Sequence, residues 1–478
     1  MSDSVVWSFI MCIGIVTALS LAAVAAERPL HSPDKKVIEL DWVTPDAAYL
    51  AEHIREMEKF PFDGIALQAG AEDASMLDAR PWGHDPVYCD VEGLAKVEWR
   101  RFRHNFLLCS PNLVDGFSWF DDRQWATILD NMRMLARAAR AASGDGIMFD
   151  PETDRDRSPW PYARTGEGRP REEVEAKVRQ RGREIIDAWQ SEMPDVKVLS
   201  LWVFGYNIPT WDLLPAFFNG ILDGLGPQAV LIDGDESSYY WASTNTWFDS
   251  GLHGEKYIKP ENLEKWRTQV QLARSPYTDL IWGRYVWEGY EWKASLDDMR
   301  RRWEHNIYYG LATADEYIWC HSEMMAYWFR GANDNKRTDY DEPWSGVVEG
   351  LESAIAKYRA GERLGWDIIG PESANSDFTI DSSVVVNITS PTHRSSRRGP
   401  ATITVEAEAT GGEIERVEFY LNVEKVGDAT AAPYRREMRD LPVGSYTFFA
   451  RAFTTDGRHG TSGPATITVT GGRDGTGK

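Results

Sequence analysis

The stretch VIELDWVTPDAAYLAEHIREMEK, residues 37–59, contains the unit from which most of this chain is built. It begins with the largely apolar run 37–42, passes through a polar turn and continues over 47–59 with the spacing of an amphipathic helix. The side chains on one stripe of that helix are Leu50, His53, Ile54 and Met57. We therefore predict a buried strand followed by a helix that packs on it.

The same alternation repeats along the chain as far as residue 361. The predicted strands are 37–42, 64–68, 105–108, 146–150, 197–202, 229–233, 280–286 and 316–320. The predicted helices include 47–59, 123–142, 172–192, 211–225, 262–273, 296–311 and 347–359. Strands that alternate with helices pair in parallel, and eight such units in about 300 residues predict a (β/α)8 barrel. The alternative is a doubly wound open sheet, whose typical glycine-rich turn does not follow the first strand here.

The pattern changes near residue 370. Residues 371–377 are typical of a linker, and after Ser383 short alternating strands and turns replace the long helices. We assign 33–368 to the barrel, 369–382 to the linker, 383–471 to an all-β domain and 472–478 to a disordered tail. The 478 residues are ample for this many parts and for a large buried core.

Five segments of the all-β region carry a resemblance. They are 386–391, 399–405, 414–422, 432–434 and 444–452. These segments closely resemble the bacterial immunoglobulin-like modules that are appended to secreted polysaccharide-degrading enzymes, which implies a small sandwich used as a spacer or weak binder. The period-two pattern predicts that Val417, Phe419 and Leu421 face inward against Tyr446, Phe448 and Ala450, with a turn at 456–457.

The first 26 residues indicate export. Residues 5–24 form an apolar run that ends in small residues up to Ala26, which is typical of a secretory signal. Met1–Ser4 has no Lys or Arg, and an uncleaved run would be long enough to span a bilayer as an anchor. In both cases we expect a secreted, periplasmic or cell-surface protein. Cys12 would leave with the signal, and Cys89 and Cys109 are candidates for a disulfide.

The amino-acid composition limits the classes of ligand that the protein is expected to bind. Hydrophobic residues make up 42% and charged residues 26%, which excludes wholesale disorder and a multi-span membrane protein. Acidic residues outnumber basic ones by 74 to 52, and the formal charge of −22 disfavours nucleic acid, anionic membranes and polyanionic ligands. The 21 Trp, 19 Tyr and 18 Phe are a surplus of flat amphipathic rings that suits stacking on sugars. A neutral saccharide is therefore the expected substrate.

Acidic residues gather where predicted barrel strands end, and barrel enzymes act at those ends. Glycoside hydrolysis needs one carboxylic acid that holds a proton and a second carboxylate. Period-two alternation points Asp150 and Glu152 in the same direction, toward the barrel mouth. The predicted catalytic residues are Glu152 as general acid, Asp150 as its partner, and Glu323, Asp233, Asp235 and Glu236 as candidates for the second carboxylate. The alternative for each single residue is a helix cap or a loop salt bridge.

The sequence 145–152, Asp-Gly-Ile-Met-Phe-Asp-Pro-Glu, also resembles a family motif. It is similar to the fourth-strand motif Asp-Gly-x-Asp-x-Asp-x-Glu of family-18-type chitinases. The resemblance implies that Glu152 is the general acid and that Asp150 orients an acetamido group. Met148 replaces the middle Asp and Pro151 precedes the Glu, which puts chitin itself in doubt. Barrel, immunoglobulin-like tail and export signal together resemble a secreted bacterial glycoside hydrolase.

Aromatic residues accompany these carboxyls on the loops that follow the strands. The predicted substrate-binding residues are Asp41, Trp160, Tyr206, Tyr239, Tyr240, Trp241, Trp287, His321 and Trp328. Aromatic rings can instead pack in the hydrophobic core and contact no ligand. We assign Trp202, Trp282 and Trp319 to the core because they lie within predicted strands.

Two other functions stay open. A metal-dependent barrel hydrolase usually binds its metal through several histidines at the strand ends. This chain has only nine histidines, and His321 is the only one that we place at a predicted strand end. An all-oxygen Ca²⁺ or Mg²⁺ site at Asp150, Asp233 and Asp235 would be structural. A non-catalytic carbohydrate-binding barrel is the second alternative, which Met148 at an acidic motif position favours. The favoured hypothesis is a secreted glycoside hydrolase without cofactor that cleaves a neutral, β-linked polysaccharide of the cellulose, β-glucan or chitin-like kind.

Overall fold

The computed structural model describes residues 31–41, 44–68, 75–83, 89–153, 155–204, 210–282, 295–323, 325–328, 345–370 and 378–471. They divide into two compact units. The barrel unit comprises Lys35–Trp241 and Leu252–Ser353, and the immunoglobulin-like unit contains Ala242–Gly251 and the residues from Ala354 onward. The short segment Ala242–Gly251, which carries α8 (Thr244–Asp249), therefore groups with the second unit although it lies between barrel segments in the chain.

The described residues of the barrel unit form one sheet of eight parallel strands. The strands are β1 (Lys36–Asp41), β2 (Gly64–Gln68), β3 (Asn105–Cys109), β4 (Gly144–Phe149), β5 (Lys197–Ser200), β6 (Val230–Asp233), β7 (Val270–Leu272) and β8 (Tyr317–Ser322). Their order is β7-β6-β5-β4-β3-β2-β1-β8, so the first strand pairs with the last. Parallel bridges from Arg274 to Ile318 and from Tyr277 to His321 join the end of β7 to β8. The predicted (β/α)8 fold is confirmed.

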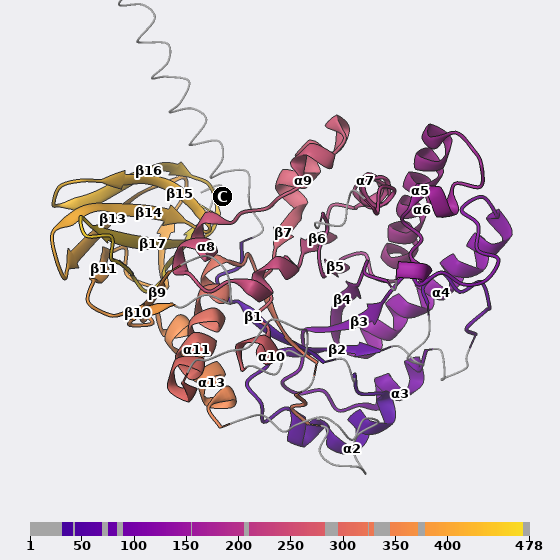
Figure 1. Ribbon diagram of the computed structural model, residues 1–478, viewed down its shortest axis with the longest axis horizontal. Helices are drawn as coiled ribbons and strands as arrows, with labels where there is room; N and C mark the ends of the chain where they lie inside the picture. The colour runs from indigo at the N-terminus through magenta and orange to yellow at the C-terminus, as the bar shows by residue number, and fades with distance from the viewer. Residues whose placement is uncertain are drawn as a thin grey trace, which may run out of the picture. The chain divides into compact units, whose positions relative to one another are not determined.

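Helices follow the strands and lie outside the sheet (Figure 1). They are α2 (Ala47–Met57), α3 (Val91–Lys96), α4 (Asp122–Ala141), α5 (Tyr162–Thr165), α6 (Arg171–Glu192), α7 (Leu214–Gly224), α9 (Leu263–Gln269), α10 (Thr278–Ile281), α11 (Leu296–Thr313) and α13 (Val347–Ala360). Short 3-10 turns occur at Arg155–Arg157, Glu236–Tyr240, Glu255–Tyr257 and Pro260–Asn262. The helix α2 shows why the pattern works: the Asp46 side chain caps Tyr49 N, and the apolar stripe residues Leu50, Ile54 and Met57 are buried.

The seventh strand lies earlier in the chain than predicted. We expect it at 280–286 after a helix over 262–273, but α9 ends at Gln269 and β7 follows at once. Residues 278–281 form the short helix α10, and 283–286 lie outside the described residues. A short apolar run does not distinguish a strand from a buried helical turn. The position of the seventh strand is set by its pairing with β6, in which Leu231 lies opposite Val270 and Asp233 lies opposite Leu272.

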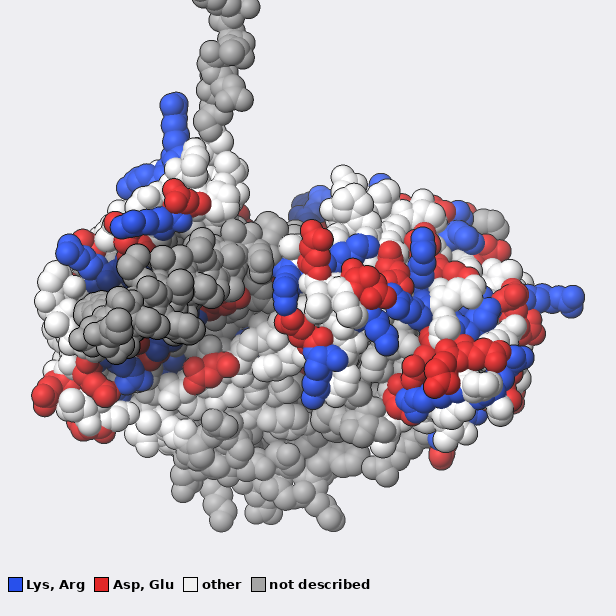
Figure 2. Space-filling model, turned by 90° about the horizontal axis from the view of Figure 1, so that it is seen from above, with Lys and Arg blue, Asp and Glu red and all other residues white. Residues whose placement is uncertain are grey.

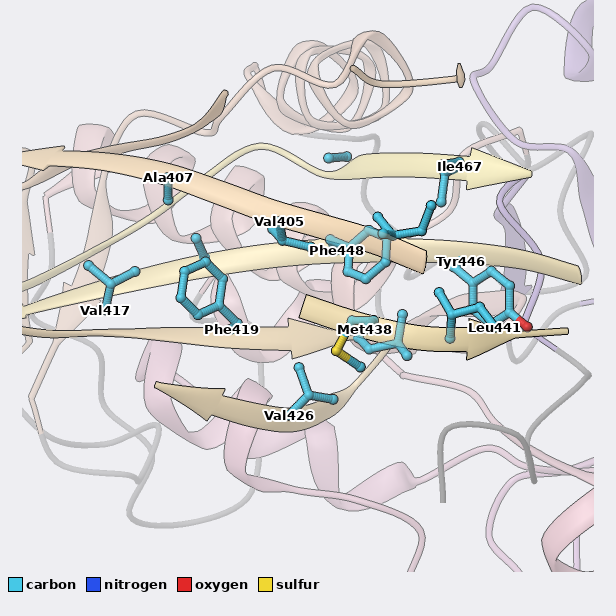
Figure 3. Close-up of a cluster of buried hydrophobic side chains, with 14 of the residues drawn as sticks. Val405, Ala407, Val417, Phe419, Val426, Met438, Leu441, Tyr446, Phe448 and Ile467 are labelled. Atoms are coloured by element: carbon cyan, nitrogen blue, oxygen red, sulfur yellow. The ribbon is translucent and has the colours of Figure 1, made fainter. Parts of the chain in front are cut away.

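Two of the sheets of the immunoglobulin-like unit share one core, part of which Figure 3 shows. One has the order β11-β13-β16 and the other β12-β19-β17-β14-β15, with β18 beside β17. The strands are β11 (Val385–Ser390), β12 (Ser395–Arg398), β13 (Ala401–Thr410), β14 (Ile414–Leu421), β15 (Glu424–Ala429), β16 (Tyr434–Leu441), β17 (Gly444–Thr454), β18 (His459–Thr461) and β19 (Ala465–Thr470).

The core of this unit is the predicted one. Val417, Phe419 and Leu421 of β14 are buried in one cluster with Tyr446, Phe448 and Ala450 of β17. The turn at 456–457 also forms, with Gly457 at a positive φ of 88°. Within the range predicted as a linker, residues 379–381 form the strand β10 (Thr379–Asp381), which pairs with β9 (Asp367–Ile369).

Three further expectations concern cysteines and export. Cys89, Cys109 and Cys320 are all free and buried, so the candidate disulfide does not form. Cys89 Sγ instead contacts the Met134 carbonyl of α4 at 3.7 Å, whereas Cys109 ends β3. The signal segment 1–26 and the tail 472–478 lie outside the described residues. Among the residues that are described, no helix is both long enough and apolar enough to cross a bilayer.

A buried ion pair stabilises the closure of the barrel. Arg274, which bridges β7 to β8, is fully buried, and its guanidinium donates to the Asp235 carboxylate that follows β6. The guanidinium also lies 4.7 Å from the centre of the Trp241 ring, and its Nε donates to Thr313 Oγ1 at 3.2 Å. Because both charges are buried, the loss of either one removes this ion pair from a low-dielectric environment.

We predict that Arg274→Met lowers the free energy of unfolding by about 3–5 kcal/mol, the usual cost of breaking a buried pair. Chemical denaturation followed by circular dichroism measures it. Adding Asp235→Asn to this variant recovers part of the loss because no buried carboxylate is then left behind. Arg183→Met on α6, whose side chain is 63% exposed, serves as the control. Equal losses in Arg274→Met and the control would contradict the pair's role.

Candidate functional site

Four carboxyl groups meet at the ends of three barrel strands. Asp150 follows β4 directly, and its backbone N–H donates to the Cys109 carbonyl of β3, which continues the sheet by one residue. Its side-chain Oδ1 accepts the backbone N–H of Glu152 at 2.8 Å. The segment after β4 is therefore turned so that both carboxyl groups sit at the same end of the strand, as the period-two pattern predicts.

The third carboxyl comes from β6. After Asp233 the chain passes through Asp235, which has the left-handed conformation (φ 46°), and Glu236 begins the 3-10 turn Glu236–Tyr240. Asp tolerates this backbone region better than most residues. The bend is held by hydrogen bonds, since the Asp235 carbonyl accepts Ser238 Oγ at 2.7 Å and Ser275 Oγ at 3.0 Å. Glu236 is thereby placed at the strand end and not in the sheet.

The fourth carboxyl comes from β8. The backbone N–H of Glu323 donates to Asp279 Oδ2 at 2.7 Å, which ties the end of β8 to α10. Oε1 of Glu323 lies 3.6 Å from His321 Nε2. The His321 ring stacks on Tyr239 with centroids 5.3 Å apart, and Tyr277 packs 4.9 Å from the same ring. An aromatic wall therefore stands beside the Glu323 carboxylate.

Mutual electrostatic effects show that these groups share one site. Burial raises the pKa of Asp150 to about 8, with a further contribution from the charge of Glu152. Although Glu152 is exposed as a residue, partial burial of its carboxyl and the charge of Glu323 raise its pKa. Burial raises the pKa of Glu236 well above its usual value, and Glu152, Asp150 and Glu323 add to this shift. Neighbouring carboxylate charges thus disfavour ionisation of Asp150, Glu152 and Glu236.

Few positive charges balance this cluster of four carboxyls. In the part of the chain that the structure describes, no Lys or Arg forms an ion pair with Asp150, Glu152, Glu236 or Glu323, and His321 is the basic group nearest to them. The same described residues contain no group of three or more His, Cys, Asp or Glu arranged to hold a metal ion. The site therefore combines Asp150, whose pKa is about 8, with Glu152 and Glu236, whose pKa values are also raised.

Asp233 and Asp235 lie in the wall of the barrel and not in the cluster. Asp233 is buried and accepts the backbone N–H groups of Val203 and Asp235, both at 3.2 Å. Burial and the nearby Asp235 charge raise the pKa of Asp233 to about 7. Asp235 is paired with Arg274, and the structural Ca²⁺ or Mg²⁺ site with Asp150 does not form among the described residues. These two carboxyls stabilise the bend that positions Glu236.

The other predicted ligand contacts divide into three groups. Tyr239 and His321 lie at the carboxyl cluster, and Tyr240 is exposed beside them. Trp160, Trp241 and Trp328 are instead buried in the core: Trp160, for example, packs on Phe217 and donates to the Pro151 carbonyl. Asp41 is buried on β1, where its charge helps to raise the pKa of Glu39. Tyr206 and Trp287 lie outside the described residues.

Sequence reasoning did not identify Asp279 and Tyr277 as parts of this site. Both follow β7, and the misplaced seventh strand hid their position at a strand end. The available signal was an acidic residue in the first turn of the short helix that follows β7. With β7 placed correctly, the same rule that selects Asp150 and Glu323 also selects Asp279.

Comparison with known proteins agrees with the division into two units. Residues 385–469 match the model of a bacterial Ig domain, which confirms the resemblance of the tail. A fibronectin(III)-like module of Clostridium thermocellum CbhA is 28% identical over 18% of this chain and 94% of that chain, with a TM-score of 0.18. The comparison with curated proteins finds no match to the chain.

Solved glycoside hydrolases are among the proteins with a similar fold. The endo-β-1,4-mannanase from Thermotoga petrophila is 10% identical over 92% of this chain and 99% of its own, with a TM-score of 0.34. Bacteroides uniformis β-glucuronidase 2 is 10% identical over 91% of this chain and 45% of its own, also with a TM-score of 0.34. Likeness at this level assigns no substrate to this chain.

The raised pKa of Asp150 predicts how stability depends on pH. The pKa is about 8 in the folded state and about 3.9 in the unfolded state, so the folded state binds more protons between these values. Stability is therefore highest at the acidic end of this window and falls as the pH rises through about 8. Asp150→Asn removes the charge but keeps an acceptor for Glu152 N. We expect it to raise the melting temperature at pH 8.5 and to have little effect at pH 5, measured by calorimetry. An equal shift at both pH values would contradict this assignment.

Proposed function

We propose that the barrel unit is a glycoside hydrolase that cleaves its substrate by carboxyl acid–base chemistry. The observation that supports it is the meeting of Asp150, Glu152, Glu236 and Glu323 at three strand ends, where burial and neighbouring carboxylate charges raise the pKa values of Asp150, Glu152 and Glu236. Glycoside hydrolysis uses two carboxyl groups of different protonation state around the scissile bond. A purely structural cluster would be expected to pair these carboxyls with Lys or Arg, as Asp235 is paired with Arg274.

In this proposal Glu152 is the general acid. Its residue is exposed, so a substrate can reach it, yet its pKa is raised by partial burial and by Glu323. The raised pKa favours the protonated form, which donates its proton to the glycosidic oxygen as the bond between that oxygen and the anomeric carbon breaks. The hydrogen bond from its backbone N–H to Asp150 Oδ1 keeps the segment in place.

Glu323 is the proposed second carboxylate. It lies beside His321, and its backbone is held by Asp279. As an anion it either attacks the anomeric carbon or takes a proton from the water that attacks it. Positive charge develops on the sugar ring as the bond breaks, and the second carboxylate beside it stabilises that charge.

The substrate class follows from the charge of the whole protein and from the rings at the site. With a formal charge of −22 the chain repels polyanions, and Tyr239 and His321 offer a wall on which a sugar can pack. We therefore propose a neutral, β-linked polysaccharide of the cellulose, β-glucan or chitin-like kind, met outside the cell. A carbohydrate-binding barrel without catalysis is the second candidate, favoured by Met148 at the acidic position of the chitinase-type motif.

We predict that Glu152→Gln lowers kcat by at least about 100-fold, since general acid catalysis contributes roughly 10² to 10⁴. The measurement is the release of new reducing ends from a panel of neutral β-linked polysaccharides, with folding checked by circular dichroism. Glu264→Gln on α9, an exposed residue remote from the strand ends, is the matched control and keeps full activity.

The same panel separates the candidate functions. Binding of a polysaccharide without new reducing ends would overturn the hydrolase in favour of the binding protein. Activity that EDTA abolishes and added metal restores would overturn the metal-free mechanism. Near-normal turnover in Glu152→Gln would remove Glu152 from the acid role, even if the polysaccharide is cleaved.

A further inference from the structure

A second hollow lies on the helical layer of the barrel unit, apart from the carboxyl cluster. It is a pocket of about 530 Å³ between α6, α7 and the 3-10 turn Glu255–Tyr257. Its lining residues are Glu172, Glu175, Ala176, Arg179, Asp212, Pro215, Ala216, Asn219, Lys256, Tyr257 and Lys259. The volume falls within the range of small-molecule sites. None of these residues belongs to the proposed catalytic group.

The floor of this pocket is built by a buried amide. Asn219 of α7 is 1% exposed, and its Nδ2 donates to the carbonyl oxygens of Pro215 at 2.8 Å and Tyr257 at 2.9 Å. Its Oδ1 accepts the backbone N–H of Lys259 at 2.8 Å. One side chain therefore fixes the loop 257–259 onto α7. The hollow is held in shape without a ligand, which lowers the entropic cost of binding one.

The polar groups of the pocket are balanced in sign. Three carboxyls (Glu172, Glu175 and Asp212) face three cations (Arg179, Lys256 and Lys259). Five side chains serve as a fixed frame: Arg171 holds Glu175 and Asp212, and Arg179 holds Asp223. Glu172, Lys256 and Lys259 form no ion pair with any residue that the structure describes, so their polar atoms are available to a ligand.

The apolar part of the pocket lining consists of an aromatic ring and small aliphatic side chains. The Tyr257 ring packs against Phe204 at 5.2 Å and carries the Lys256 ammonium 5.0 Å from its centre, and Pro215 and Ala216 line the pocket near it. A sugar unit needs this combination, because its hydroxyls both donate and accept hydrogen bonds while its C–H face packs on an aromatic ring. An anionic ligand would meet three carboxyls, and a metal cation would meet three positive charges.

The pocket lies along the first halves of α6 and α7. Its helical residues fall within the first nine residues of α6 and the first six of α7, and the rest come from the segments before α7 and around Lys256–Lys259. These helices follow β4 and β5, and helices of a (β/α)8 barrel begin at the carboxyl ends of their strands, where substrate is expected. On the right-hand part of the surface in Figure 2, acidic and basic side chains occur next to one another. A neutral chain can lie on such a surface without repulsion.

We propose that this pocket is an accessory sugar-binding site that holds one or two units of a neutral polysaccharide whose chain extends past the carboxyl cluster. Glu172, Lys256 and Lys259 would hydrogen-bond the hydroxyls, and Tyr257 would pack on the ring. The choice of a neutral polysaccharide rests on the proposed function, whereas the pocket's ability to bind a saccharide stands on its own lining.

Binding is tested in the full chain carrying Glu152→Gln, so that cleavage does not remove the ligand. The probes are a soluble β-glucan, a soluble β-mannan and, as the anionic comparison, polygalacturonate, each in affinity gel electrophoresis. We expect the double change Glu172→Ala, Lys259→Ala and, separately, Tyr257→Ala to weaken binding of a neutral probe about tenfold, the scale of one lost stacking contact. The double change Glu92→Ala, Lys96→Ala on α3 removes the same charges from an exposed helix outside the pocket and leaves binding unchanged.

The outcomes separate this proposal from the hydrolase. If the pocket variants bind as tightly as the control, the pocket proposal fails, whether or not the active chain releases reducing ends. Tighter binding of polygalacturonate than of both neutral probes, or binding of none of the three, also overturns it. Weaker binding in the pocket variants supports it even if no cleavage is found. In the active chain the pocket variants should raise KM for the polysaccharide and leave kcat on a short chromogenic glycoside unchanged. Tyr257 packs on Phe204, so Tyr257→Ala can fail to fold. In that case the double variant Glu172→Ala, Lys259→Ala tests the proposal.

Discussion

The parallel pairing of β1 with β8 is the constraint on which the rest of the barrel unit depends. It joins Lys36 to Tyr317 and Asp41 to Ser322, nearly 300 positions later in the chain. Once the first and last strands are neighbours, the carboxyl ends of all the strands face the same end of the barrel. Residues as distant in sequence as Glu152 and Glu323 then come close enough for one charge to shift the pKa of the other.

The same closure explains which acidic residues are structural. Asp235 lies on the chain that leaves β6, where the bridge from β7 to β8 brings the buried Arg274 to it. Burying the Asp235–Arg274 pair costs the hydration free energy of both charges. In return the pair holds Asp235 in its left-handed conformation. The bend in turn places Glu236 among the other carboxyls. Asp235 is thus neutralised by Arg274, whereas Glu236, the next residue in sequence, forms no ion pair with any residue that the structure describes. This contrast connects the energetics of the fold to the chemistry proposed for the site.

Periodicity predicted the long elements well, because burial on one face leaves a repeating trace in the sequence. It located α2, α4, α6 and α11 within a few residues, and the inward residues of β14 and β17 in the second unit. It misplaced β7, since three residues carry too little pattern to separate a strand from a helical turn. The rings of Trp160 and Trp328 resembled ligand contacts for a similar reason: a loop position does not reveal whether a side chain turns inward.

By itself the sequence determined the alternation of strands and helices, the immunoglobulin-like tail and the acidic character of the strand ends, because local spacing and composition encode them. Only the tertiary structure decided which carboxyls share a site, that Asp235 has an arginine partner, and that Asn219 shapes a second pocket. Those facts depend on contacts between residues far apart in the chain, and a linear pattern holds no information about the distance between two side chains until the backbone has closed.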